Sequence, residues 1–324
     1  YPAMREWMGY VERYMKDGLL TRWPDTPYRD WFLGDWLAPH GVDTGSEASV
    51  SLVNNCFVSD CYARMAQMAR LTGHDDEAAA FEARREALNR TIHARFYDPA
   101  TQTYATGSQL DMTYPMLVGA TPDSLRAGVE QRLFRLTHDV MKDHIGGGLV
   151  GVPVITRWAV RSHNPEFIYR MLKQRGYPGY LHMIDHGATA TWEYWSGERS
   201  RVHNCYNGIG TWFYQALGGL RTDSSHPGYE HVFIDPQIPE GVEWCRIGKE
   251  TPYGRIDLGW EIADGELRID VTLPPGVTAT AITPAGACRG RLDGRRLAPQ
   301  SPGTKIASGR HRLVFGLAPQ NERQ

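Results

Sequence analysis

Apolar residues recur at helical spacing through the first two thirds of the chain. This pattern predicts a first helix over residues 2–15, ended by Asp17-Gly18, and two helices over 49–72 and 75–96 that a turn at Gly73 joins as a hairpin. The same spacing predicts further helices over 110–118, 124–143, 152–162, 165–175 and 207–220.

Two long segments, 21–45 and 187–203, follow neither a helical nor a strand period, and both are rich in tryptophan. Long loops of this kind usually carry function. Since short turns alternate with long loops, we predict a toroid of helical hairpins, an (α/α)6 fold, whose long loops converge at one rim. An irregular bundle or a solenoid is the alternative, but no fixed repeat period supports a solenoid.

The pattern changes near Arg221, after which apolar and polar residues alternate between Pro/Gly turns. Short alternating segments with frequent turns predict an antiparallel β-sandwich. The expected strands include 232–234, 242–244, 255–260, 267–271, 278–282 and 311–315. The predicted fold class is therefore α+β multidomain, with an N-terminally incomplete toroid over 1–221 and a sandwich over 222–324.

Composition narrows the range of partners. The chain has 324 residues, 41% of them hydrophobic, 22% charged, and a net charge of −2. These values suit a globular protein and argue against binding to nucleic acid or an anionic membrane through bulk charge. No stretch approaches the ~20 apolar residues of a membrane span.

The five cysteines are odd in number and form no CxxC pair, so we expect free thiols and neither a disulfide framework nor a zinc site. The chain opens on Tyr1-Pro2 without a signal peptide, and we read it as a piece of something longer. Its compartment is left open.

The strongest candidate for chemistry is Glu193, which lies between Trp192 and Trp195. Tryptophan faces stack on sugar rings, and a glycosidase needs a carboxylate beside the sugar as acid, base or nucleophile. The alternative is a buried tryptophan pair with a solvated or salt-bridged glutamate. In the first aromatic loop, Asp35 and Trp36 offer a similar carboxylate and ring, although Asp35 could instead cap a turn.

Other reaction classes find little support. His182, Asp185 and His186 lie close together, but a regular helix between Gly179 and Gly187 is doubtful, and we expect no metal site. The run 146–148 (Gly-Gly-Gly) lacks the Lys-Ser/Thr of a phosphate loop and is interpreted as a flexible rim turn. No Gly-x-Ser-x-Gly occurs, so we expect no esterase.

Several motifs, in this order, resemble those of glycoside hydrolase family 78, the α-L-rhamnosidases. The central one is Gly-Ala-Thr-x-Thr-Trp-Glu-x-Trp-x-Gly over 187–197, followed by Ser200-x-x-His203 and by Gly-x-Gly-x-Trp over 208–212. Further matches are Gly-Asp-Trp-Leu-Ala-Pro at 34–39 and Glu-Thr-Pro-Tyr-Gly-Arg-Ile at 250–256.

The resemblance implies an inverting hydrolase of terminal α-L-rhamnosyl groups that needs no cofactor. It assigns Glu193 as general base and His203 as a ligand of sugar hydroxyls, with Asp35, Trp36, Trp192 and Trp195 in substrate binding. A histidine can donate to or accept from a hydroxyl. A lone histidine is, however, more often structural.

The family's acidic block, which carries the general acid, has no copy in this sequence. We therefore expect residues 1–324 alone to be inactive on unactivated rhamnosides. We also expect them to self-associate, or to bind a separate N-terminal region, through a helix side carrying Trp7, Met8 and Val11. If the chain does contain its acid, Asp25, Asp30 and Asp35 are the candidates.

Two alternatives stay open. One is another toroid enzyme, either a different glycosidase or a polysaccharide lyase. A lyase would need cations to neutralise a uronate, and between 187 and 210 only Arg199 and Arg201 are available. The other is a sugar-binding protein without activity, in which the acid block is truly absent.

Overall fold

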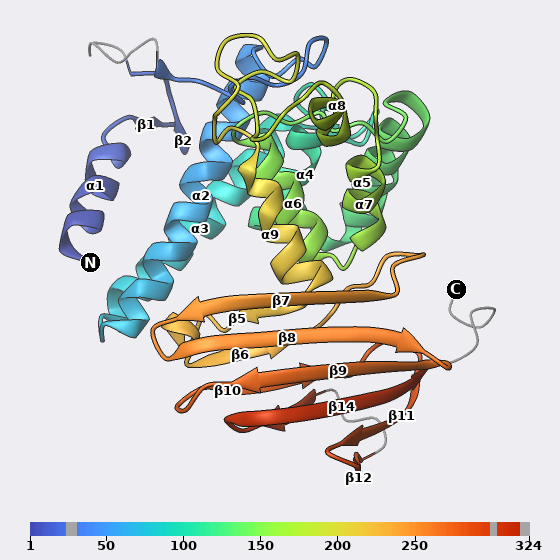
Figure 1. The fold of residues 1–324 in the computed structure, drawn as a ribbon. Helices are drawn as coiled ribbons and strands as arrows, with labels where there is room; N and C mark the ends of the chain where they lie inside the picture. Colours follow the sequence, from blue (N-terminus) through green and yellow to red (C-terminus); the bar gives the residue numbers. More distant parts are fainter. Residues whose placement is uncertain (24–30, 299–302, 318–324) are drawn as a thin grey trace. The chain divides into compact units, whose positions relative to one another are not determined.

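The computed structural model describes residues 1–23, 31–298 and 303–317. They form two compact units (Figure 1). Unit 1 comprises residues 1–162 and 167–209 and is helical, whereas unit 2 comprises 163–166 and 210–324 and is built mainly from strands. The expected class, a helical toroid-like region followed by a sheet region, is confirmed. Each unit is described by itself below.

Helices alternate with short and long connections in unit 1. Only three or four residues separate α2 from α3 and α4 from α5, whereas long segments precede α2, α4 and α6. Because successive helices run back and forth, the long segments gather at one rim, as a toroid of hairpins requires. The helices are α2 (Glu47–Leu71), α3 (Asp75–Phe96), α4 (Gln109–Val118), α5 (Asp123–Arg135), η2 (Leu136–Val140), α6 (Gly151–Arg161), α7 (Pro165–Leu172) and α8 (Tyr180–Asp185).

Local capping explains where two of these helices begin. The hydroxyl of Ser46 accepts a hydrogen bond from the amide of Ser49 at the start of α2, and that of Ser108 accepts one from Asp111 at the start of α4. Gly119, in the left-handed conformation, ends α4. The core then forms where α4 packs between α2 and α6.

The N-terminal helix differs from the prediction. α1 (Pro2–Glu12) is shorter than expected, and β1 (Met15–Lys16) pairs with β2 (Leu19–Leu20). The connecting Asp17 and Gly18 both have positive φ, because an Asp-Gly pair suits the tight turn of a hairpin. The expected apolar side of α1 is also divided, since Met8 and Val11 are buried and Trp7 is 47% exposed.

Unit 2 contains two packed sheets. The six-stranded sheet has the order β12-β11-β14-β9-β8-β7, and the four-stranded sheet has the order β13-β10-β6-β5. The helical stretch of η3 (Asn207–Ile209), α9 (Gly210–Trp212) and η4 (Phe213–Leu217) precedes the first strand. The strands are β5 (Leu220–Thr222), β6 (His231–Ile234), β7 (Trp244–Thr251), β8 (Gly254–Ala263), β9 (Glu266–Leu273), β10 (Thr278–Ile282), β11 (Ala287–Leu292), β12 (Arg295–Arg296), β13 (Gly303–Ile306) and β14 (Gly309–Leu317).

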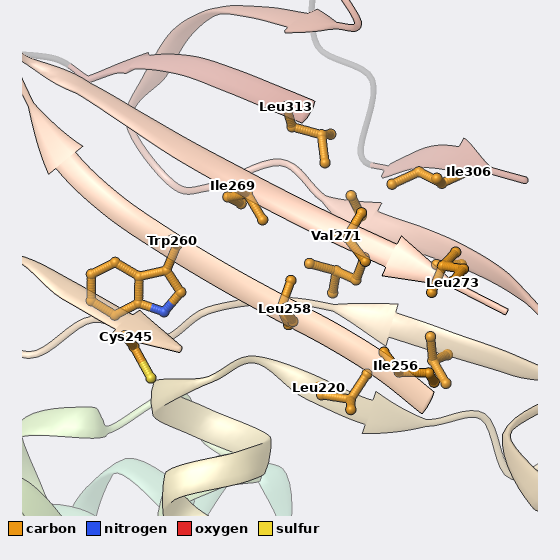
Figure 2. Packing of buried hydrophobic residues seen from close by; sticks show 14 of the residues in the cluster. Leu220, Cys245, Ile256, Leu258, Trp260, Ile269, Val271, Leu273, Ile306 and Leu313 are labelled. Atoms are coloured by element: carbon orange, nitrogen blue, oxygen red, sulfur yellow. The ribbon is translucent and has the colours of Figure 1, made fainter. Parts of the chain in front are cut away.

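The inward positions of both sheets make the core of the sandwich. Figure 2 shows Ile256, Leu258 and Trp260 of β8 beside Ile269 and Val271 of β9, at alternate positions along each strand. Alternation puts every second side chain on the buried face. The indole nitrogen of Trp260 donates a hydrogen bond to the carbonyl of Leu217 at 2.7 Å, so the ring is both packed and satisfied.

Two details correct the sequence-based expectations. β10 runs parallel to β6, so the sandwich is not wholly antiparallel. This is possible because β7, β8 and β9, which lie between them in the chain, belong to the other sheet and let the chain return in the same direction.

A short regular helix, α8, also forms between Gly179 and Gly187, where we doubted one. None of the helices in the described ranges is long and apolar enough to cross a membrane.

Candidate active site

Glu193 lies in the long loop between α8 and η3, at the rim of unit 1 that carries the long loops. Its backbone amide donates to the carbonyl of Ser200 at 2.8 Å, and its carboxylate accepts from the amide of Ser200 at 3.3 Å. These two bonds close the segment 193–200 into a compact loop. The side chain is half-buried, so the carboxylate is held at the surface without being sealed off.

Gly197 is required by the turn that follows Glu193. Its φ is +80°, and a Cβ at this position would lie 2.7 Å from the ring of Trp192. Its amide donates to the carbonyl of Tyr194 at 3.0 Å. The last glycine of the Trp-Glu-x-Trp-x-Gly motif therefore lets the chain turn back tightly over the first tryptophan.

Trp195 and Tyr206 tie this loop to its neighbours. The two rings stack with centroids 3.9 Å apart, and the indole nitrogen of Trp195 donates to the carbonyl of Gly147 at 2.9 Å. The Tyr206 hydroxyl lies 3.0 Å from the carbonyl oxygen of Leu37 and 3.1 Å from that of Glu193. The two predicted tryptophan-rich loops therefore meet at one buried hydroxyl.

Asp35 is buried and its carboxylate is fully engaged. It accepts hydrogen bonds from the amides of Gly148 at 2.6 Å and of Val150 and Gly151, both at 2.8 Å, where α6 begins. Burial raises the pKa of this carboxyl to about 6, against the three amide bonds that favour the charged form, and the charge of Asp111 adds to the rise. Asp35 therefore organises the start of a helix.

The glycines opposite Asp35 let the segment before α6 approach the first aromatic loop closely. A Cβ on Gly151 would lie 2.4 Å from the Asp35 carboxylate, and a Cβ on Gly148 would lie 2.2 Å from the carbonyl oxygen of Trp36. Residues 145–148 are buried. Our interpretation of 146–148 as a flexible rim turn is therefore wrong, because these glycines pack against the first aromatic loop.

His203 is held in one orientation by its own loop. Its backbone amide donates to the carbonyl of Thr191 at 2.8 Å, and its Nδ1 accepts from the amide of Cys205 at 3.1 Å. Because Nδ1 is an acceptor, the neutral imidazole carries its hydrogen on Nε2. The half-buried ring therefore has an N–H to offer a ligand hydroxyl.

The tryptophans of the predicted site divide into two kinds. Trp192 and Trp195 are each 2% exposed, so neither presents an open ring face. Trp36 is 45% exposed and directly precedes Leu37, whose carbonyl oxygen is hydrogen-bonded to Tyr206. Only Trp36 of the three has a ring free for stacking in this conformation.

The two arginines of this loop stack on rings. The guanidinium of Arg199 lies 5.6 Å from the ring centre of Tyr194, and the guanidinium of Arg201 lies 5.1 Å from the ring centre of Trp192.

Sequence reasoning missed Tyr206, since no signal marks a tyrosine between two motif blocks as the point where two loops meet. Asp25 and Asp30, named as alternative acids, lie outside the described residues.

Within the described ranges, no group of three or more His, Cys, Asp or Glu side chains is placed to hold a metal ion.

The long loops of the helical-hairpin unit bring a carboxylate, a histidine and an exposed tryptophan to one rim, and a β-sandwich follows that unit in the chain. This is the architecture of the six-hairpin glycosidases.

Comparison with known proteins identifies the family. Residues 1–217 match the bacterial α-L-rhamnosidase 6 hairpin glycosidase domain, and residues 219–295 match the bacterial α-L-rhamnosidase C-terminal domain. The chain belongs to the bacterial α-L-rhamnosidase family, which confirms the resemblance to glycoside hydrolase family 78.

Among curated relatives, an α-L-rhamnosidase of Alteromonas sp. (strain LOR) is 24% identical over 303 residues, which cover 88% of this chain and 32% of that protein. The crystal structure of Streptomyces avermitilis α-L-rhamnosidase complexed with L-rhamnose matches with a TM-score of 0.82 and 22% identity, covering 97% of this chain and 30% of that one. The structure of α-L-rhamnosidase from Dictyoglumus thermophilum matches with a TM-score of 0.85 and 17% identity, covering 98% and 36%. The chain thus spans about a third of the length of these relatives.

Proposed function

We propose that the protein hydrolyses terminal α-L-rhamnosyl groups of glycosides or polysaccharides with inversion at the anomeric carbon. Membership of the rhamnosidase family supports the reaction class. The observation that carries the proposal is the junction at Tyr206, which joins the loop of Glu193 to the loop of Trp36. A junction that joins the loop of a half-buried carboxylate to the loop of an exposed ring suits a sugar-binding subsite.

In this proposal Glu193 is the general base. In an inverting glycosidase one carboxylate removes a proton from a water molecule that attacks the anomeric carbon, while a carboxylic acid protonates the departing oxygen on the other face. The bond to the Ser200 amide orients the Glu193 carboxylate and leaves acceptor capacity for that water. His203 would donate from Nε2 to a sugar hydroxyl, and Trp36 would stack on the ring.

We assign the other three site residues a positioning role. Asp35 binds three backbone amides and holds the start of α6, so it has little capacity left for a sugar. Trp192 supports the Gly197 turn, and Trp195 anchors the loop to Gly147. They would act on the reaction through the placement of Glu193 and Trp36.

The alternatives are less well supported. A polysaccharide lyase would need cations at the sugar carboxylate, and both Arg199 and Arg201 lie over rings of their own loop. A sugar-binding protein without activity remains the second candidate, because its site would need the same Trp36 and His203 but no base. Loss of activity on changing Glu193 separates the two.

Glu193→Gln in the natural full-length chain is the direct test. The amide is nearly isosteric but cannot accept the proton, so kcat on an α-L-rhamnoside should fall by roughly 10²–10⁴-fold while the melting temperature stays unchanged. Glu198→Gln, at an exposed glutamate of the same loop, is the matched control and should retain activity. Proton NMR of the first product should show β-L-rhamnose. Wild-type turnover by Glu193→Gln would remove this residue from the mechanism.

A further inference from the structure

The outer face of the six-stranded sheet in unit 2 is hollowed. Strands β7, β8, β9 and β14 lie side by side in this sheet (Figure 1). Because Leu258 and Trp260 of β8 point into the core of the sandwich, Gly259 between them faces outward. The hollow has a volume of about 960 Å³ and is lined by residues of unit 2 alone. We call it the sheet hollow, and its lining includes Trp244, Arg246, Gly259, Asp270, Arg310 and Arg312.

Strand register brings outward residues of the hollow into one row. Arg246 of β7 is paired with Gly259 of β8, Gly259 with Asp270 of β9, and Asp270 with Arg312 of β14. Since neighbouring strands are about 4.8 Å apart, the row is about 14 Å long. A row of this length suits a ligand made of several linked units.

Gly259 has no explanation in the fold itself. Glycine weakens the interior of a strand, and it occurs there at bulges, at tight bends or where another molecule approaches the backbone closely. The register of β8 is continuous through Gly259 on both sides, so no bulge requires it. A Cβ here would lie 3.3 Å from the Cγ of Arg246, an exposed side chain that can move away. We attribute this glycine to the close approach of a ligand.

A tryptophan and two arginines give the hollow its chemistry. Trp244 is 66% exposed and precedes Arg246 by two positions, so both side chains leave β7 on the same face. Arg312 binds Asp270 through two hydrogen bonds, at 2.7 and 2.8 Å, so these two charges offset each other. Neither Arg246 nor Arg310 forms an ion pair with any residue that the structure describes.

Most carboxylates of the lining are engaged. Glu243 is exposed and forms no ion pair within the described part of the chain. The others have partners, which are Arg255 for Asp257, Arg268 for Glu261, Arg312 for Asp270 and His311 for Asp293. Arg246 and Arg310 are therefore the groups of the hollow that can recognise an anion, and they lie on the same face as an exposed ring.

We propose that the sheet hollow binds an oligosaccharide chain that carries acidic groups. Trp244 stacks on the apolar face of one sugar, and Arg246 and Arg310 bind the acidic groups. The acidic group is a carboxylate or a sulfate, because a planar guanidinium forms paired hydrogen bonds with oxyanions of this kind. This inference goes beyond the proposed hydrolysis and does not depend on Glu193, since the hollow lies entirely in unit 2.

Calorimetric titration of the natural full-length chain with oligosaccharides that contain no rhamnose tests the proposal. Tetragalacturonic acid carries carboxylates, its methyl ester has the same backbone without charge, and a κ-carrageenan tetrasaccharide carries sulfates. At least one acidic probe should bind, and the methyl ester should bind at least about 10-fold more weakly than tetragalacturonic acid if that acid is the ligand. The acidic probe that binds identifies the acidic group.

Three variants locate the binding. Trp244→Ala should weaken it roughly 3- to 10-fold by removing the ring, and Arg246→Ala about 10-fold by removing a charged donor. Gly259→Val fills the centre of the hollow with a residue that suits a strand, so it should weaken binding without lowering the melting temperature. Arg296→Ala is the matched control. It removes the same charge from an exposed position on β12, outside the hollow, and should bind as the wild type does.

Several results would overturn the proposal. One is no binding of either acidic probe, and another is binding of the methyl ester as tight as that of the acid. Wild-type affinity in Trp244→Ala or in Gly259→Val is a third. Self-association of the wild type that Gly259→Val abolishes, measured by sedimentation velocity, is a fourth, since a second copy of the chain would then occupy the hollow.

A failure of the proposed function would be seen separately. Hydrolysis of p-nitrophenyl α-L-rhamnoside should be the same in the wild type and in all four variants, because none of the changed residues belongs to the candidate active site. If the wild type does not hydrolyse this substrate, the rhamnosidase assignment fails and the titrations still decide the role of the sheet hollow.

Discussion

At the scale of single residues, the roles of the two loop carboxylates separate by burial. Glu193 is half-buried and receives one amide bond, whereas Asp35 is 7% exposed and receives three. A carboxylate that is already saturated holds structure, and one with open acceptor positions is able to act on water. The same residue type therefore supports a base at one position and a helix start at the other.

The raised pKa of Asp35 predicts a pH dependence of stability. The pKa of Asp35 is about 6 in the folded chain and about 3.9 in the unfolded chain, so protonation of this carboxyl stabilises the folded state. This stabilisation is fully present below about pH 4 and is lost as the pH rises through about 6. The difference in free energy of unfolding between wild type and Asp35→Asn should shrink by about 3 kcal/mol over that range. Denaturant titrations at several pH values measure it. A constant difference would contradict the expectation, and Asp76→Asn at an exposed site is the control.

At the scale of the element, the loop 187–206 depends on a few backbone positions. Gly197 turns the chain over Trp192, and Tyr206 holds the carbonyl of Glu193. No helix or strand supports the segment between them. Its shape therefore comes from its turns and from side-chain contacts, including those of Trp195 with Gly147 and of Tyr206 with Leu37.

Gly197→Ala tests this dependence. The new Cβ would meet the Trp192 ring at 2.7 Å, so the loop has to shift and kcat/KM should fall by more than about 10-fold. Gly187→Ala is the matched control, since Gly187 has a φ of +84° but nothing within 4 Å of its Cβ. It should cost only the left-handed strain of about 1–2 kcal/mol and retain the kinetics. Equal activity of the two variants would show that the ring contact is unimportant.

At the scale of the whole molecule, each unit has its own core. Trp195 is buried in unit 1 on Tyr206, and Trp260 is buried in unit 2 among the residues of Figure 2. Each indole nitrogen has a carbonyl partner, at Gly147 and Leu217 respectively. The two tryptophans are comparable anchors of two separate structures.

Leucine substitutions should therefore act locally. Trp260→Leu loses packing and leaves the Leu217 carbonyl without its donor, which should cost unit 2 about 2–4 kcal/mol. Hydrogen exchange should increase in β7, β8 and β9, and Trp195→Leu should increase it in the loop 187–206 instead. The same exchange pattern in both variants would contradict two separate cores.

Periodicity alone determined most of the helices and strands. The helix 75–96 coincides with α3, and the predicted strands 232–234, 255–260 and 267–271 fall within β6, β8 and β9. These predictions succeed because the apolar positions on the buried face of a helix or strand repeat at the period of that element. β5, β11, β12 and β13 were missed, and the predicted 242–244 meets β7 only at its first residue. β5, β12 and β13 are short edge strands, which carry little alternation.

The site was only partly predictable. The order of motifs singled out Glu193, His203 and Trp36 and identified the family, because each of these residues belongs to a motif whose residues are adjacent in the chain. The roles of Asp35, Trp195 and Tyr206 depend on partners at Gly148, Gly147 and Leu37, more than 45 positions away in each case. Burial and long-range hydrogen bonding are properties of the packed chain, so only the tertiary structure decided which carboxylate and which ring remain open to a ligand.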